Sequence, residues 1–276
     1  MERQRITGQI QAYSKKTREE LIKLGEYVFK TAGVESVFRE VYSCIDELVK
    51  NAVKANYKFI LIIEYLEKKI KKTNPDFSDE KIRELVNLIV KNRSEYDREA
   101  ENILKTERLS GFVREILNEE AVQIRIKNKA YDAKRVYDDE EIGKLIDLKK
   151  INFIRKEMTD HNVNVFVKYD FDDEYIYVEA TNSSPILESD LRRIYEKRDE
   201  FRKCREEDRQ QEFFLNNLDT SESGFGLGYA TIDSYLTDLG LEPYSTIQII
   251  AAADTTVILS LPILFLRERC AVNQSV

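Results

Sequence analysis

The chain has 276 residues, of which 42% are hydrophobic and 34% charged, and its formal net charge is −7 at pH 7. This content suffices for one large domain or two ordinary ones, and the acidic balance argues against broad binding to nucleic-acid phosphates. The three cysteines are too widely spaced for a disulfide framework or a zinc site, which indicates a reducing, cytoplasmic setting. The N-terminus lacks an apolar signal-peptide region and polar residues interrupt the most apolar run, so we expect no membrane-spanning segment.

The first part of the chain is predicted to be helical. Residues 4–32 have a helical pattern that ends near Gly33, and we assign residues 1–35 to an N-terminal helix. A second helix is expected from Glu35 to a break at residues 73–75, because apolar residues recur at three- and four-residue spacing and so share one buried face. The residues of this face are Val37, Phe38, Val41, Ile45, Leu48, Val49, Ala52 and Val53.

A charge-rich helical stretch follows, and the pattern then changes to strands and helices. Residues 121–137 fit either a helix or a short strand, whereas residues 203–223 are polar and have no clear periodicity. Alternation of apolar and polar residues after position 160 predicts a hairpin and two further strands. The predicted helices are 79–105, 108–119, 139–159, 188–202 and 226–239, and the predicted strands are 163–170, 174–181, 246–252 and 255–261.

One motif that could carry chemistry lies on the second helix. Glu47 and Asn51 are four residues apart and Lys54 is three further on, so the three side chains share one strip of a helix. An amide oxygen suits a hard cation, a lysine suits phosphates and a carboxylate can activate water. On this segment alone, the strip is more typical of an ordinary amphipathic helix with a solvated edge.

A second motif opens the helix predicted over 226–239. Gly224, Gly226 and Gly228 alternate over five residues, and such a turn lets backbone N–H groups surround an anion at a helix N-terminus. The spacing differs from the dinucleotide-binding fingerprint, and the sequence contains no P-loop motif. The segment therefore predicts phosphate binding of another kind.

Together, and in this order, the two motifs resemble the Bergerat-fold (GHKL) ATPases, which include histidine kinases and chaperone ATPases. Residues 47–54 (ELVKNAVK) are similar to the N box of that family, E-L-x-x-N-A-x-K, and residues 224–228 are similar to its glycine box, G-x-G-L-G. Residues 254–262 are similar to its closing G-T-x-x-x-x-x-L-P segment, and residues 191–201 to the stretch before its ATP lid. The match covers residues 36–60 and 163–262.

The resemblance implies an α+β fold with a mixed, mostly antiparallel sheet and helices on one face, here with a large helical insert. It implies ATP and Mg²⁺ as ligands, with Asn51 as the magnesium ligand, Lys54 as a phosphate contact and Glu47 as the base that activates water. Thr255 would lie near the nucleotide and the glycines would hold its phosphates. The implied divisions are a nucleotide-binding domain at 36–60 and 161–265, an insert at 61–160, a lid at 203–223 and a tail at 266–276.

The sequence departs from the family pattern at the base-recognition segment. The family has D-x-G-x-G there, whereas this chain has neither that Asp nor its glycines, and the aspartate position corresponds to Thr181 or, after a small shift, to Asn182. An amide oxygen can accept the same hydrogen bond, with reduced strength. Asp254 also replaces a glycine before Thr255, and the only histidine, His161, is not on a helix before the N box. Self-phosphorylation on histidine in the usual manner is therefore not expected.

Three functions remain open at this point. The protein could be an ATPase or a kinase that acts on a separate partner, a nucleotide-gated interaction module without turnover, or an interaction protein that has lost the nucleotide. The intact N box and glycine box favour the first two, and imply a signalling or regulatory role. The insert is either a surface for a protein partner or a second copy of the chain, or a purely structural subdomain. No membrane partner is expected.

Overall fold

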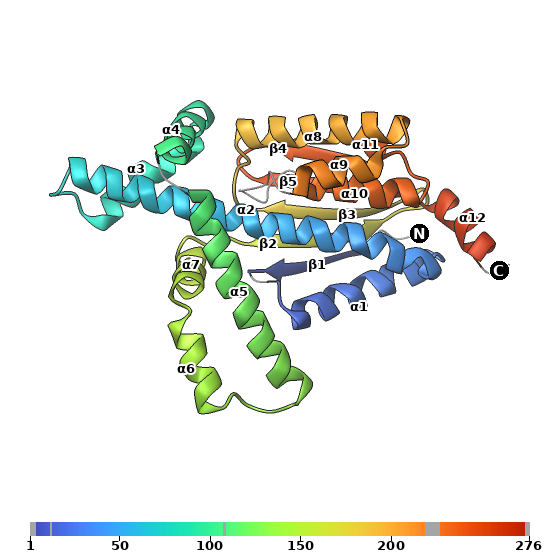
Figure 1. The fold of residues 1–276 in the computed structure, drawn as a ribbon, viewed down its shortest axis with the longest axis horizontal. Coiled ribbons are helices and arrows are strands. Elements are labelled where there is room, and N and C mark those ends of the chain that lie inside the picture. Colours follow the sequence, from blue (N-terminus) through green and yellow to red (C-terminus); the bar gives the residue numbers. More distant parts are fainter. Residues whose placement is uncertain (1–3, 12, 107–108, 219–226, 274–276) are drawn as a thin grey trace.

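The computed structural model describes residues 4–11, 13–106, 109–218 and 227–273. An antiparallel sheet forms one layer, with the strand order β1-β2-β3-β5-β4 (Figure 1). Its strands are β1 (Gln4–Ile10), β2 (Val165–Phe171), β3 (Tyr175–Asn182), β4 (Ile247–Ala251) and β5 (Thr255–Pro262). Every described strand pair is antiparallel, so the α+β class is confirmed and the expected mixture of parallel and antiparallel pairs is not found.

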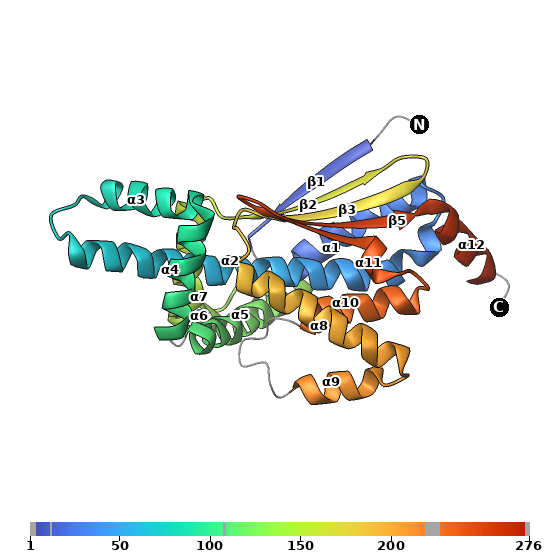
Figure 2. The ribbon, with the colours of Figure 1, turned by 90° about the horizontal axis from the view of Figure 1, so that it is seen from above.

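Helices cover one face of the sheet, as Figure 2 shows. Burial alternates along β3 and β5, and residues of β3 such as Ile176 and Val178 are buried beneath this helical layer, whereas their neighbours are half-buried. This period of two is what a sheet with one covered face requires. The helices of this layer are α1 (Lys15–Thr31), α2 (Phe38–Thr73), α8 (Glu188–Glu206) and α10 (Leu227–Asp238).

Helix α2 connects the sheet to the helical insert. It has 36 residues, which at 1.5 Å per residue makes it about 54 Å long. Its first part packs on the sheet, and its second part extends beyond the sheet beside the insert helices (Figures 1 and 2). The insert helices are α3 (Asp79–Lys91), α4 (Arg93–Thr106), α5 (Leu109–Asp132), α6 (Asp139–Asp147) and α7 (Lys149–Asp160).

Shorter elements complete the described chain. They are a 3₁₀ turn at Glu35–Val37 and the helices α9 (Gln210–Leu218), α11 (Pro243–Thr246) and α12 (Ile263–Asn273). None of the helices in the described part of the chain carries an apolar stretch that could span a bilayer.

The helices predicted over 79–105 and 139–159 are each divided in two, at Asn92 and at Leu148. Three further segments differ from the structure in the kind of element. The helix predicted over 4–32 is wrong at its start, because Gln4–Ile10 pairs with β2 and the helix begins only after Ser14 caps it by accepting from the Thr17 N–H. The strand considered within 121–137 is also wrong, since Gln123 and Ile126 are buried at helical spacing in α5.

The third difference is in the polar segment 203–223. Helix α8 continues to Glu206 and α9 occupies 210–218, so most of this segment is helical. Phe213 on α9 is buried against Phe201 on α8, with ring centroids 5.4 Å apart. This apolar contact packs α9 against α8. The pattern of residues 203–223 does not predict it, because Phe201 lies outside that segment. The rest of the proposed lid lies outside the described residues.

Candidate functional site

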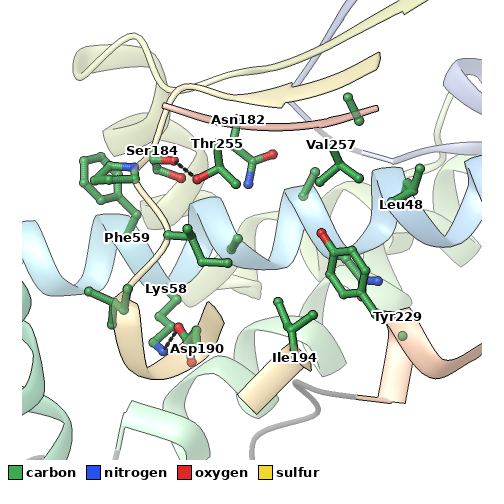
Figure 3. A pocket seen from close by; sticks show the side chains of 18 of the residues that line it. Leu48, Lys58, Phe59, Asn182, Ser184, Asp190, Ile194, Tyr229, Thr255 and Val257 are labelled. Atoms are coloured by element: carbon green, nitrogen blue, oxygen red, sulfur yellow. Dashed lines mark hydrogen bonds and ion pairs between the residues drawn. The ribbon is translucent and has the colours of Figure 1, made fainter. Parts of the chain in front are cut away.

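A cavity lies between α2, the ends of β3 and β5, and helices α8 and α10 (Figure 3). The space between its walls is about 830 Å³, including open solvent at its mouth. Its lining is mostly apolar, and the polar side chains gather at the strand ends and along α2 and α8. The polar lining residues are Asn51, Lys58, Asn182, Ser184, Asp190, Arg193 and Thr255.

The two sequence motifs meet at this cavity. Asn51 on α2 and Gly228 in the first turn of α10 both line it. A Cβ atom on residue 228 would lie 2.2 Å from Asn51 Nδ2, so only glycine permits this approach of the two helices. The Nδ2 atom is buried and has no hydrogen-bond partner among the described residues. The N-terminal N–H groups of α10, which lack partners within the helix, thus begin beside an unsatisfied amide.

Asn182, rather than Thr181, is the cavity residue at the end of β3. Its side chain is 6% exposed and points from the strand into the cavity (Figure 3). None of the described residues forms a hydrogen bond with its carboxamide, and neither polar atom of that group is among the fully buried ones that lack a partner, so the carboxamide is accessible from the cavity. Thr181 lies on the opposite face of the sheet, where its hydroxyl is 2.9 Å from that of Thr256. The alternation of the strand therefore puts Asn182, and not Thr181, in the cavity lining.

Thr255 is the residue paired with Asn182 across the sheet. Its hydroxyl is buried and donates to the Ser184 carbonyl at 2.9 Å, and the Ser184 hydroxyl in turn donates to Asn56 Oδ1 at 2.8 Å. These bonds tie β5, the segment after β3 and helix α2 together. Thr255 thus lines the cavity, with its hydroxyl proton already engaged by the protein.

A charged group that the sequence did not single out closes the cavity on the side of α8. The Lys58 ammonium forms an ion pair with Asp190 at 2.5 Å, and Arg193 Nη2 donates to the other oxygen of Asp190 at 2.9 Å. Burial lowers the pKa of Lys58, and the attraction of Asp190 opposes that effect. Lys58 is seven residues after Asn51, so its spacing alone could have placed it on the same helix face.

Two expected residues of the N box do not line the cavity. Glu47 and Lys54 are both half-buried on α2, one turn before and one turn after Asn51, and neither belongs to the described lining. The cavity instead follows the helix face of Leu48, Ala52 and Ala55. Gly224 and Gly226 lie outside the described residues, so Gly228 alone represents the glycine box here.

The donors around Asn51 are suited to Mg²⁺ only as part of a complex with a ligand. No three His, Cys, Asp or Glu side chains gather at one place in the described chain to hold a metal by themselves. Mg²⁺ commonly takes one or two protein oxygens and completes its shell with phosphate oxygens and water. The unpartnered Asn51 atom is Nδ2, a hydrogen-bond donor that suits a phosphate oxygen, whereas a magnesium ion would need Oδ1 of the same side chain. Bound with a polyphosphate, the ion would neutralise part of the phosphate charge.

Comparison with known proteins gives no further guidance, since no protein family, no curated protein and no solved structure matches this chain.

Proposed function

We propose that this protein binds Mg-ATP in the cavity between α2, β3, β5, α8 and α10, as a signalling or regulatory protein with a histidine-kinase-like (GHKL) ATPase fold. One observation carries the proposal. Asn51 and Gly228, which belong to the two motifs of the family resemblance and lie far apart in the chain, touch at the edge of a cavity that also holds the unsatisfied amide of Asn182. A ligand with a hydrogen-bonding planar base and a polyphosphate would satisfy these groups.

The base would lie against Asn182 and the apolar side chains of the cavity. A carboxamide offers both a donor and an acceptor, so it can pair with the adenine edge or, after rotation, with the guanine edge. We therefore expect Mg-ATP and Mg-GTP to bind with affinities closer to each other than a carboxylate at this position would give. The phosphates would lie toward the N-terminus of α10.

The position of Glu47 favours binding without rapid turnover. A water-activating base must reach the reacting phosphate, and Glu47 is not among the residues that line the cavity. We therefore favour a nucleotide-gated interaction module over a vigorous ATPase or kinase. Release of phosphate from Mg-ATP that depends on Glu47 would support the enzyme instead.

Calorimetric titration tests the proposal. Mg-ATP and Mg-GTP are titrated into the wild type, Asn51→Ala and Asn182→Ala, with Asn87→Ala as a control on the exposed surface of α3. We expect saturable binding to the wild type and to Asn87→Ala, and affinity at least about tenfold weaker for the two cavity variants, since each loses a hydrogen bond or metal ligand. Equal binding by all four proteins, or none by the wild type, would overturn the proposal.

A further inference from the structure

The helical insert contributes directly to the wall of the cavity. Tyr96 on α4 is one of the lining residues and is 1% exposed. Its ring packs against Phe59 of α2, with centroids 6.1 Å apart at an interplanar angle of 63°. None of the described residues hydrogen-bonds its hydroxyl, and this oxygen is not among the fully buried polar atoms that lack a partner, so it is accessible from the cavity. This hydroxyl is therefore available to a molecule in the cavity.

The same helix also holds the segment between β3 and α8. Arg93 donates from Nη2 to the Ile186 carbonyl and from Nε to Asp97 at 2.8 Å. Asp97 in turn accepts from the Glu188 N–H, the first residue of α8, at 3.2 Å. The residues of this segment that line the cavity are Ser184, Pro185, Ile186 and Leu187. Figures 1 and 2 both show α4 beside this end of α8.

Arginine is suited to this position because its planar guanidinium makes two hydrogen bonds in fixed directions. One bond reaches the Ile186 carbonyl, and the other orients Asp97, which accepts from the Glu188 N–H. A displacement of α4 would therefore have two effects at once: it would move the segment 184–187, and it would remove Tyr96 from the cavity. By linkage, a ligand that contacts Tyr96 would in turn stabilise the observed position of α4.

We propose that the insert is part of the ligand site: Tyr96 donates a hydrogen bond to the bound nucleotide, and Arg93 is a positioning residue that holds segment 184–187 against it. This inference rests on the proposed nucleotide binding. It gives the insert a role in ligand affinity, so that a protein that binds the insert and shifts α4 would weaken the nucleotide complex.

The Tyr96 contact is tested by titration of Mg-ATP into Tyr96→Phe, with Tyr137→Phe, exposed in the α5–α6 connection, as the matched control. We expect Tyr96→Phe to weaken binding by about three- to tenfold, the effect of one hydrogen bond, without lowering the unfolding midpoint of the free protein. Tyr137→Phe should bind as the wild type does. Unchanged affinity in Tyr96→Phe would refute the contact.

The role of Arg93 is tested without nucleotide, by amide hydrogen exchange over residues 183–188. Arg93→Gln is compared with Arg98→Gln, which removes an exposed arginine from the same helix. We expect exchange in this segment to be about tenfold faster in Arg93→Gln only, because the Ile186 carbonyl loses its partner. Equal exchange in both variants overturns the positioning role. If the wild type binds no nucleotide, the Tyr96 contact fails with the proposed function, whereas this exchange result still decides the role of Arg93.

Discussion

Substitution of Gly228 by alanine tests the contact that joins the two motifs. The added Cβ would lie 2.2 Å from Nδ2, 2.7 Å from Oδ1 and 2.8 Å from Cγ of Asn51. These distances are far below van der Waals contact, so either the Asn51 side chain rotates away or α2 and α10 separate. Overpacking of this kind typically costs about 1–3 kcal/mol of folding free energy.

The three nearest atoms to the added Cβ all belong to Asn51, and this makes a double-mutant cycle informative. All three close atoms belong to the Asn51 side chain beyond Cβ, so Asn51→Ala removes them. In that background, Gly228→Ala should be neutral or stabilising by up to about 1 kcal/mol, because alanine is the better helix former. The two substitutions should therefore show an interaction free energy of about 1–3 kcal/mol.

Urea unfolding followed by far-ultraviolet circular dichroism measures the four free energies of unfolding. Gly111→Ala is the control, because a Cβ at this α5 position has no atom within 4 Å. Gly111→Ala should change the free energy of unfolding by the same amount in the wild type and in Asn51→Ala. The reasoning is refuted if Gly228→Ala changes the free energy of unfolding equally in both backgrounds.

Three further predictions concern stability and reactivity. The side-chain hydrogen bonds from Arg135 lower the pKa of Glu141 to about 2. Because the pKa is lower in the folded state, this stabilisation is present above about pH 4.5 and is lost as the pH falls toward 2. The urea midpoint of Glu141→Gln should therefore depend less on pH over that range than the midpoint of the wild type does. The ion pair between Arg198 and Asp233 is almost fully buried, at 1% and 2% side-chain exposure. Asp233→Ala should destabilise the protein by about 3–5 kcal/mol in urea unfolding, and replacement of both residues by apolar ones of similar volume should recover most of the loss; an equal loss in the double variant would contradict this. Burial raises the pKa of Cys44 to about 12, so in a thiol-reagent assay at pH 8 it should react far more slowly than the two half-buried cysteines, and equal rates would contradict its burial.

Elements with strong periodicity could be predicted from the sequence. The alternation in β3 and β5 and the apolar face of α2 each specify a local structure and the side of it that is buried. The strand β1 could not be recognised, since its seven residues include Gly8 and only Ile6 and Ile10 alternate as a strand should. It exists because β2 offers an edge with which it pairs.

The candidate site could be predicted only in part, for a related reason. The motifs indicated Asn51, Gly228 and Thr255, which line the cavity. The sequence left Thr181 and Asn182 as alternatives, and the orientation of the strand shows that Asn182 is the one in the cavity. Spacing along a helix identifies the face on which Lys58 lies, but not that Asp190 covers it. Tyr96 belongs to an insert whose position relative to the sheet depends on packing between distant segments, which a local pattern does not contain.

A crystal structure with Mg²⁺ and a non-hydrolysable ATP analogue tests the central claim most directly. We predict that the base lies within hydrogen-bonding distance of the Asn182 carboxamide and close to Tyr96 or the apolar wall. The phosphates should lie beside Asn51 and Gly228. An analogue bound elsewhere, or a cavity filled by the protein's own side chains at saturating analogue, would contradict it.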